Sequence, residues 1–398
     1  WRVDAKAPPD QTSRSSWLNG SVLGIGLASL LADSSHEMAT AVLPALLASF
    51  GAGSAALGLI EGASDALAGF AKLFSGFYSD GLRRRKPLAV AGYGVTAAAM
   101  GGLAWTGAAW QALCLRSAGW LGRGVRSPVR KAILSQCAPP GAVGRAFGFE
   151  RAMDNLGAVV GPLLAAVFLA RAGLRRTFVF TFVPGILAAA VFLFWVKEPP
   201  RKDPVSRGLP EGLDALPARF KRLLAAAGAA GSGDFSKTLL ILWAEEAWRG
   251  RMGFSRAAPL AMLFYAGYNA VQVFSSYASG LLADRFSGTR SLSLGYAAAV
   301  IPAALLLFPG SSPLKFAAVF GFCGLYAGTW ETLESAAAAR LLPEELRGAG
   351  FGALAAVNGA GDLVSSAAVG VLWAFSPAAA MACVAASAGL GSFLAARI

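Results

Sequence analysis

Long apolar segments recur along the whole chain and are separated by short polar stretches. Each segment is near or above the roughly 20 residues that an α-helix needs to cross a bilayer. Segments of about ten residues with alternating polarity, which are typical of membrane barrels, do not occur in the sequence. The pattern predicts an all-α integral membrane protein with about twelve transmembrane helices. The predicted spans are residues 18–49, 54–79, 87–107, 109–135, 145–170, 177–196, 220–247, 257–282, 291–308, 313–339, 348–373 and 377–396.

The composition supports this prediction. Of the 398 residues, 56% are hydrophobic and 14% are charged, whereas soluble domains carry roughly 25% charged residues. The formal net charge is +13, but most lysines and arginines fall in cytoplasmic segments if both termini are placed in the cytoplasm. We therefore expect a multi-pass protein of the plasma membrane, specifically a bacterial inner membrane, that contacts the lipid bilayer and no nucleic acid. The four cysteines lack the spacing of metal ligands, so no metal is expected.

One segment rich in proline, glycine and charge divides the chain into two halves. Such a composition is typical of a linker between structured units. We expect a first six-helix lobe over residues 1–196, a cytoplasmic linker over 197–219 and a second six-helix lobe over 220–398.

The two halves are related in sequence. "GFYSD" at 76–80 matches "GLLAD" at 280–284, and "GRAFGFERAMDNLG" at 144–157 matches "GAGFGALAAVNGAG" at 348–361, both at an offset of 204. A constant offset over this distance indicates an internal structural repeat. Nearer the start, "ADSSH" matches "GDFSK" at an offset of 201. These pairs set Asp33 beside Asp234 and His36 beside Lys237.

Two parallel halves of six spans each are similar to the carriers of the major facilitator superfamily, and the likeness covers nearly all of the chain. The family's loop pattern G-x-L-a-D-r-x-G-r-k resembles the residues that follow Gly76, although Tyr78, Gly81 and Arg83 depart from it. The second copy, which begins at Gly280, is closer at its start. The resemblance implies a two-lobed carrier that works by alternating access. It implies no catalytic residue and no cofactor other than the proton gradient.

The loop after the second span is a candidate gate. Asp80 ends that span and faces the cations of residues 83–86, so we expect it to cap a helix terminus or to pair across the lobes. Such contacts would hold the cytoplasmic side shut. The alternative is that these cations anchor the loop to anionic lipid. The gate candidates are Gly76, Asp80, Arg84, Arg85, Gly280, Asp284 and Arg285.

The fifth span carries "GAVVGPLLA" at 157–165, which resembles the antiporter signature g-x-x-x-G-P-x-x-G with alanine at the last position. Gly157 and Gly161 lie one helical turn apart and permit close helix contact, while Pro162 interrupts the hydrogen-bond ladder. The resemblance implies exchange and therefore export. The alternative is a packing face of small residues.

Ionisable residues occur inside several predicted spans. The resemblance implies that spans one, four, seven and ten line a central cavity. Charges that faced lipid would cost several kcal/mol each, which also directs them inward. The proton-coupling candidates are Asp33, His36, Glu37, Glu150, Asp154 and Asp234. The substrate-cavity candidates are Arg116, Arg123, Arg126, Arg130, Lys237, Tyr265, Tyr268, Asn269, Trp330, Glu331, Glu334, Asn358 and Asp362.

Two interpretations of these residues remain open. A carboxylate in a partly desolvated cavity can exchange a proton during transport, whereas a nearby arginine can keep it ionised and lock the lobe together. For the aromatic residues, the alternative to a role in solute binding is packing in the core.

The sequence predicts a monomeric secondary active transporter that exports a small organic solute by alternating access, coupled to protons. Within carriers, the alternative is an organic-anion or siderophore-type transporter whose span-four arginines bind a carboxylate or phosphate. A membrane-embedded enzyme with His36 beside Ser34 or Ser35 is less favoured, because these serines lack a Gly-x-Ser-x-Gly sequence.

Overall fold

The computed structural model describes residues 17–52, 54–200, 208–234, 240–241, 243–244, 247–248, 254–286, 288–307, 310 and 312–398. Every regular element in this part is helical, which confirms the predicted fold class. The first half contains α1 (Gly20–Ser49), α2 (Ser54–Asp80), α3 (Lys86–Gly102), α4 (Ala109–Cys137), α5 (Val143–Ala172) and α6 (Leu174–Trp195). The later helices are α7 (Leu209–Asp214), α8 (Ala218–Gly231), α10 (Phe254–Arg285), α11 (Gly288–Ala297), α12 (Val300–Leu307), α13 (Pro313–Leu341), α14 (Arg347–Phe375) and α15 (Pro377–Ala396).

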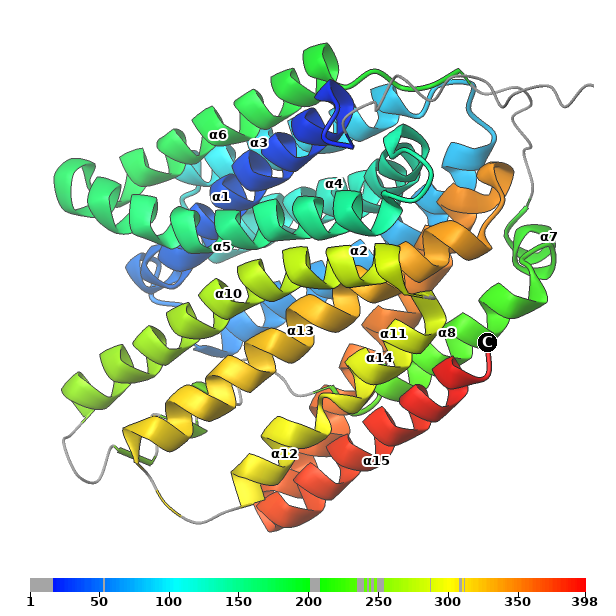
Figure 1. Ribbon diagram of the computed structural model, residues 1–398. Coiled ribbons are helices and arrows are strands. Elements are labelled where there is room, and N and C mark those ends of the chain that lie inside the picture. The colour runs from blue at the N-terminus through cyan, green and yellow to red at the C-terminus, as the bar shows by residue number, and fades with distance from the viewer. Residues whose placement is uncertain are drawn as a thin grey trace, which may run out of the picture.

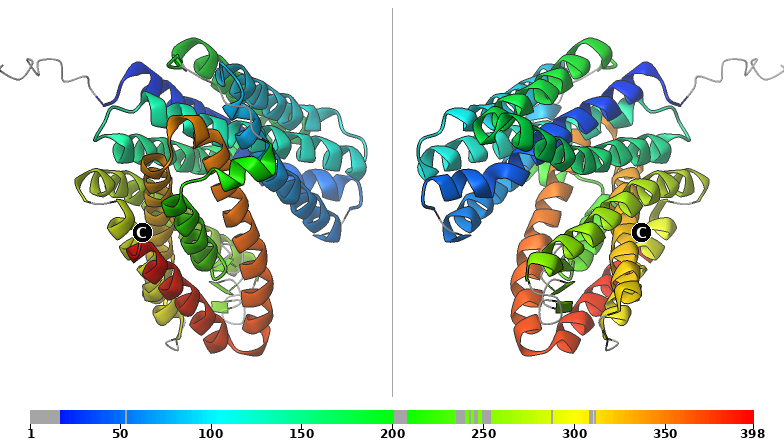
Figure 2. Two further views of the ribbon diagram at one scale, coloured as in Figure 1. Left: turned by 90° about the vertical axis from the view of Figure 1, so that its right-hand side faces the viewer. Right: turned by 90° about the vertical axis from the view of Figure 1, so that its left-hand side faces the viewer.

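The helices form two groups that lie against each other (Figure 1). In the first group, α1 packs on α5 and α6, and α4 packs on α2 and α3. In the second group, α10 packs on α13, and α15 packs on α8 and α11. The groups meet where α5 packs on α10 and α2 packs on α14, and Figure 2 shows them as an upper and a lower set. We call these groups the first and second lobes.

Glycines bring the two lobes into backbone contact at positions related by the sequence repeat. A Cβ atom at Gly280 in α10 would lie 2.5 Å from the carbonyl oxygen of Gly144 in α5. A Cβ atom at Gly348 in α14 would lie 2.5 Å from the carbonyl oxygen of Gly76 in α2. Only a residue without a side chain permits this approach. The offset of 204 therefore corresponds to a twofold arrangement of the contacts between the lobes.

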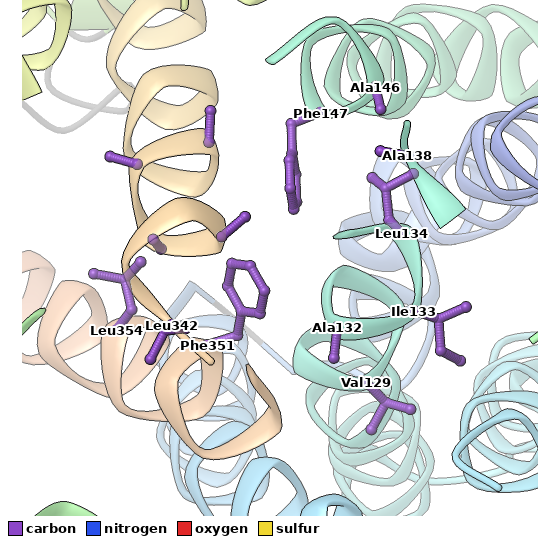
Figure 3. Packing of buried hydrophobic residues seen from close by; sticks show 14 of the residues in the cluster. Val129, Ala132, Ile133, Leu134, Ala138, Ala146, Phe147, Leu342, Phe351 and Leu354 are labelled. Carbon is purple, nitrogen blue, oxygen red and sulfur yellow. The ribbon is translucent and has the colours of Figure 1, made fainter. Parts of the chain in front are cut away.

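Phe147 and Phe351 occupy equivalent positions of the repeat and face each other across the lobe interface (Figure 3). Their ring centroids are 5.7 Å apart, and both side chains are almost fully buried. Equivalent residues can touch only near the axis that relates the two halves. The pair therefore marks this axis with an apolar contact, which burial stabilises.

Two predicted spans are not continuous helices, and here the sequence analysis was wrong in detail. In the predicted span 220–247, α8 ends at Gly231 and is followed by a turn through Ser232 and Gly233. Glycine and serine are poor helix formers, which explains the interruption. Asp234 follows this turn, whereas its counterpart Asp33 lies inside the continuous helix α1.

The predicted span 291–308 is divided into α11 and α12 by a turn at residues 298–299. Pro302 lies four residues after Ala298, where this turn begins. Proline has no amide hydrogen to donate to the Ala298 carbonyl, and its ring clashes with that carbonyl in a regular helix. The remaining predicted spans begin and end within a few residues of observed helices.

In the described part of the chain, five helical segments are long and apolar enough to cross a membrane. They cover Lys86–Trp105, Val143–Ala172, Leu174–Trp195, Thr289–Leu307 and Ala378–Ala396. Helix α4 is not among them, because four arginines interrupt its apolar face. Three of these arginines, Arg116, Arg126 and Arg130, are buried.

Candidate functional site: a charged cavity between the lobes

A cavity of about 260 Å³ lies between the lobes. Helices α2, α4 and α5 of the first lobe and helices α13 and α14 of the second lobe contribute to its wall. Its lining residues are Lys72, Trp120, Arg123, Arg126, Ser127, Arg130, Lys131, Phe147, Glu150, Arg151, Asp154, Trp330, Glu331, Glu334, Ser335, Ala355, Asn358, Gly359 and Asp362. The cavity thus brings together many of the charged residues that the sequence places inside spans.

Arg130 is the centre of a buried ionic network on the first-lobe side. Its guanidinium lies 2.7 Å from a carboxylate oxygen of Glu150 and 3.4 Å from one of Asp154. It also donates to Ser29 Oγ at 2.7 Å, and Ser29 donates to Glu150 at 3.0 Å. All four side chains are buried. Because a buried charge is costly unless it is paired and hydrogen-bonded, this network stabilises the wall only while it is complete.

Arg151 connects the two lobes through carboxylates on both sides. It donates to Asp154 in its own helix at 3.0 Å and forms an ion pair with Glu331 in α13. Gln272 of α10 donates to the same Glu331 carboxylate at 3.3 Å. Any separation of the lobes at this level must therefore break or rearrange an ion pair.

Lys131 and Ser335 also lie at equivalent positions of the repeat and are bonded to each other. The Nζ atom of Lys131 in α4 donates to Ser335 Oγ in α13 at 3.0 Å. Together with the Phe147–Phe351 contact, this bond places a polar and an apolar interaction near the axis between the halves.

Arg126 differs from the other arginines of the cavity because no carboxylate of the described residues lies within ion-pair distance of it. Its guanidinium carbon lies 4.3 Å from the centroid of the Tyr93 ring, which supplies a cation–π contact. The side chain is only 2% exposed, and its buried Nη1 has no hydrogen-bond partner among the described residues. Arg126 therefore presents, at the cavity wall, an unused donor and a positive charge that no carboxylate of the described residues contacts.

Glu334 lies on the opposite wall and has only neutral partners. The hydroxyl of Tyr296 in α11 donates to one carboxylate oxygen at 2.7 Å, and Asn358 Nδ2 in α14 donates to the other at 2.5 Å. Glu334 is 3% exposed. Within the described chain, no lysine or arginine lies within ion-pair distance of this carboxylate.

The predicted cluster on α1 lies beside the cavity and not in its lining. Asp33 forms an ion pair with Arg123 at 2.7 Å, and Arg123 itself lines the cavity. The His36 ring packs edge-on against Trp120 with centroids 4.8 Å apart. Glu37 is half-buried and does not line the cavity.

Arg116 is almost fully buried and also lies outside the cavity lining. It donates to Thr40 Oγ1 at 2.9 Å and to the sulfur of Met100 at 3.5 Å. These contacts hold Arg116 in the packed interior of the first lobe.

Several predicted residues of the second lobe surround a different, smaller cavity. This cavity has a volume of about 50 Å³, and Asp234, Tyr268, Trp330 and Glu331 contribute to its lining. Tyr265 stacks on Tyr268 with ring centroids 5.7 Å apart.

The last two substrate-cavity candidates are Asn269 and Lys237. Asn269 is buried and lines neither cavity, and Lys237 lies outside the described residues. Trp330 and Glu331 border both cavities.

Contacts at one end of the bundle join Asp80 to the opposite lobe. Asp80 at the end of α2 accepts hydrogen bonds from the amides of Gly348 and Ala349 at 3.0 and 2.7 Å, at the beginning of α14. It also forms an ion pair with the fully buried Arg85. A carboxylate at a helix N-terminus is stabilised by free amides and by the helix dipole. The structure therefore has both features expected for Asp80, the helix cap and the contact across the lobes.

Asp284 makes the equivalent contact in the other direction. It accepts from the amides of Gly144 and Arg145 at 2.7 and 3.0 Å, and its carboxylate also binds the side chains of Arg145 and Arg340. We call the Asp80 and Asp284 contacts together the interlobe junction. The candidates Arg84 and Arg285 are exposed and lie outside these contacts. Sequence reasoning missed Arg145 and Arg340, because both are distant from Asp284 along the chain.

We expect Asp80→Asn and Asp284→Asn to leave the protein folded and to weaken the interlobe junction. Each amide keeps one oxygen as an acceptor but loses the charge that favours the helix N-terminus and the arginine. Distances between spin labels on the two lobes should shift toward a population separated at this end. Identical distance distributions in wild type and both variants would contradict this expectation.

The two glycines of α5 that resemble an antiporter signature pack against α1. A Cβ atom at Gly157 would lie 2.5 Å from the carbonyl oxygen of Leu30, and one at Gly161 would lie 2.7 Å from that of Ser34. Helix α5 continues through Pro162. These distances match the small-residue packing that was the alternative interpretation.

Comparison with known proteins gives a consistent family. A family model described as Major Facilitator Superfamily matches residues 25–366. A relative from Methanocaldococcus jannaschii, described as an uncharacterized MFS-type transporter, is 28% identical over 369 residues, which are 90% of each chain. An uncharacterized protein of Mycobacterium tuberculosis is 29% identical over 385 residues, which are 94% of this chain and 90% of the relative.

Solved structures share the fold at low sequence identity. The Escherichia coli fucose:proton symporter FucP superposes with a TM-score of 0.74 at 14% identity, over 94% of this chain and 98% of FucP. The human organic anion transporter MFSD10 superposes with a TM-score of 0.73 at 16% identity, over 94% of this chain and 99% of that protein. At these identities the likeness establishes the arrangement of helices.

Proposed function

The chain belongs to the major facilitator superfamily and is a multi-pass membrane transporter, and from this premise we propose that it carries a small organic anion by proton-coupled alternating access. The observation that carries the proposed substrate class is Arg126. A buried donor without a partner costs about 1–3 kcal/mol, and a cation without a counter-ion is more costly still. A bound carboxylate or phosphate would supply both the acceptor and the charge.

The other arginines of the first-lobe wall are already paired with carboxylates. Arg130 and Arg151 are paired with carboxylates of the protein, and Arg123 is paired with Asp33. An anion that entered the cavity would compete with those carboxylates at Arg130 or Arg151, but not at Arg126. Trp120 and Trp330 also line the cavity, and their rings suit the apolar body of an organic solute.

The interlobe junction supports the alternating-access part of the proposal. Its contacts are hydrogen bonds and ion pairs between small or charged groups, which can separate and re-form without unfolding either lobe. We propose that the junction lies on the cytoplasmic side of a bacterial inner membrane, where both termini also lie, and closes that side when it is formed. The resemblance of residues 157–165 to an antiporter signature supports proton exchange and export as the direction.

The test begins with a thermal-shift screen of the purified protein against defined carboxylates, phosphates and neutral solutes. A ligand that binds the folded state raises the apparent melting temperature. Anions identified in this way are then tested for counterflow in proteoliposomes, and the proton flux is recorded with a trapped pH-sensitive dye. Opposite movement of solute and protons would support export by exchange. Binding of neutral solutes alone would contradict the proposed substrate class.

Arg126→Gln should weaken the binding of an anion found in this screen by about 10- to 150-fold, the equivalent of roughly 1.5–3 kcal/mol. The glutamine keeps a hydrogen-bond donor but removes the charge and the contact with Tyr93. Arg116→Gln is the matched control, because Arg116 lies on the same helix outside the cavity. Affinity is measured by calorimetry on folded protein. Equal losses of affinity in the two variants would show that Arg126 has a structural role and does not bind the anion.

A further inference from the structure

We propose that Glu334 is the group that takes up and releases the coupled proton. The inference rests on the proposed proton-coupled function and goes beyond it by naming the site. It starts from the difference between Glu334 and the other carboxylates at or beside the cavity.

Four of those carboxylates contact arginine. Asp33 pairs with Arg123, Glu150 and Asp154 pair with Arg130, and Glu331 pairs with Arg151. A guanidinium in direct contact favours the ionised form of a carboxylate. To accept a proton, each of these groups would first have to leave its cation and then leave that cation buried and unpaired.

Glu334 has a hydrogen-bonding environment that accepts both of its charge states. Its partners are the Tyr296 hydroxyl and the Asn358 amide. Both groups donate to a carboxylate, and both also carry an oxygen that can accept from a protonated carboxyl group. Burial without a cation in contact disfavours the charged form, while the two donors favour it. The group can therefore change charge without loss of a partner.

The sequence repeat explains how this environment arises. At the offset of 204, Glu334 corresponds to Arg130, and Asn358 corresponds to Asp154. Arg130 and Asp154 form an ion pair in the first lobe, whereas Glu334 and Asn358 form a hydrogen bond in the second. These two helix positions thus hold an ion pair in the first lobe. In the second lobe they hold a glutamate that can gain or lose a proton beside a neutral asparagine.

The charged and titratable groups around Glu334 come from each helix packed near it. They are Lys131 in α4, Asp234 after α8, Tyr296 in α11, Tyr326 and Glu331 in α13, and Asp362 in α14. Lys131 is the cation of the opposite lobe and is bonded to Ser335, the residue next to Glu334. Movement of the lobes changes the distance of this cation from Glu334. This links the charge state of Glu334 to the conformation of the transporter.

The chemical step is a reversible proton transfer. A hydronium ion that enters the cavity transfers a proton to the Glu334 carboxylate. One O–H bond of hydronium breaks, the O–H bond of the carboxylic acid forms, and neutral water remains. The reverse step returns the proton to water, and no other bond changes.

The test is an infrared difference titration of the full-length protein in lipid, between about pH 4 and about pH 9, a range that includes both ordinary and buried glutamates. Wild type should gain a carboxylic-acid C=O band at the acidic end. Glu334→Gln should lose this band. Glu331→Gln is the matched control, because Glu331 lies one turn away on the same helix and lines the same cavity. It should keep the band.

Tyr296→Phe provides a second test that does not depend on the folding of Glu334→Gln. Removal of the tyrosine hydroxyl takes away one hydrogen bond of Glu334, so the C=O band should move to higher frequency and remain pH-dependent. A band that survives in Glu334→Gln, an unchanged frequency in Tyr296→Phe, or the absence of the band from wild type would each overturn the proposal.

Transport measurements separate this inference from the proposed function. If pH-gradient-driven accumulation of a solute from the screen persists in Glu334→Gln, the function stands and the proton site is wrong. If the infrared titration behaves as expected but solute movement carries no proton in wild type, Glu334 binds a proton and the coupled function is wrong.

Discussion

Replacement of Arg130 by methionine should lower the free energy of unfolding by about 3–5 kcal/mol, the range for removing one partner of a buried ion pair. The substitution keeps an unbranched side chain but leaves Glu150 buried without its cation, and it removes one of the two arginines at Asp154. Ser29 also loses the donor that it accepts from. Denaturation in mixed micelles with increasing fractions of an ionic detergent measures the change.

Two further variants identify the cause of that loss. Arg130→Met combined with Glu150→Gln should recover much of the stability, because no uncompensated charge remains at Glu150. Arg171→Met replaces an exposed arginine in the last turn of α5 and should change the stability by under about 1 kcal/mol. If the double variant is no more stable than Arg130→Met, the network does not owe its stability to charge compensation.

Gly280→Val should prevent the close approach of α10 and α5 and shift the protein away from the conformation in which the interlobe junction is formed. A Cβ atom there meets the backbone of Gly144, which cannot move independently of its helix. Overpacking of this kind costs typically about 1–3 kcal/mol, which corresponds to a population change of about 5- to 150-fold. Label-to-label distances across the junction report the shift.

Gly267→Val is the control for this substitution. Gly267 lies on the same helix, and a Cβ atom at this position would meet nothing within 4 Å apart from its chain neighbours and the backbone of its own helix. The helix-propensity cost of valine is the same at both positions, so only the interlobe contact differs. Equal distance distributions in the two variants would show that the α5–α10 contact does not control the conformation.

The architecture could be predicted because it depends on local and periodic features. Apolar segments of spanning length define helices wherever they occur, and the offset of 204 relates the two halves without any knowledge of their packing. The interruption before Pro302 was missed because apolar residues continue through it. The one after Gly231 was missed because the small and polar residues 232–234 were included in one span with the apolar residues on either side. Local breaks of this kind depend on which backbone groups find partners in the folded protein.

The partners within the site could not be predicted from the sequence. The cations expected to face Asp80 were its neighbours along the chain, and one of them, Arg85, does so. Asp284 instead takes Arg145 and Arg340, which only the folded bundle brings near. For the proton-coupling candidates, pairing with a nearby arginine was one of the two interpretations left open, and the contact of Asp33 with Arg123 matches it.

The contacts near the twofold axis bear on how such a chain can arise by duplication. In a homodimer of two identical six-helix units, a residue on the axis touches its own copy. The Phe147–Phe351 contact is compatible with that condition, because two identical rings pack well together. The Lys131–Ser335 contact is not compatible with that condition, because two copies of Lys131 would place like charges side by side in the interior. This hydrogen bond therefore requires two halves that have diverged, which is possible once both are encoded in one polypeptide.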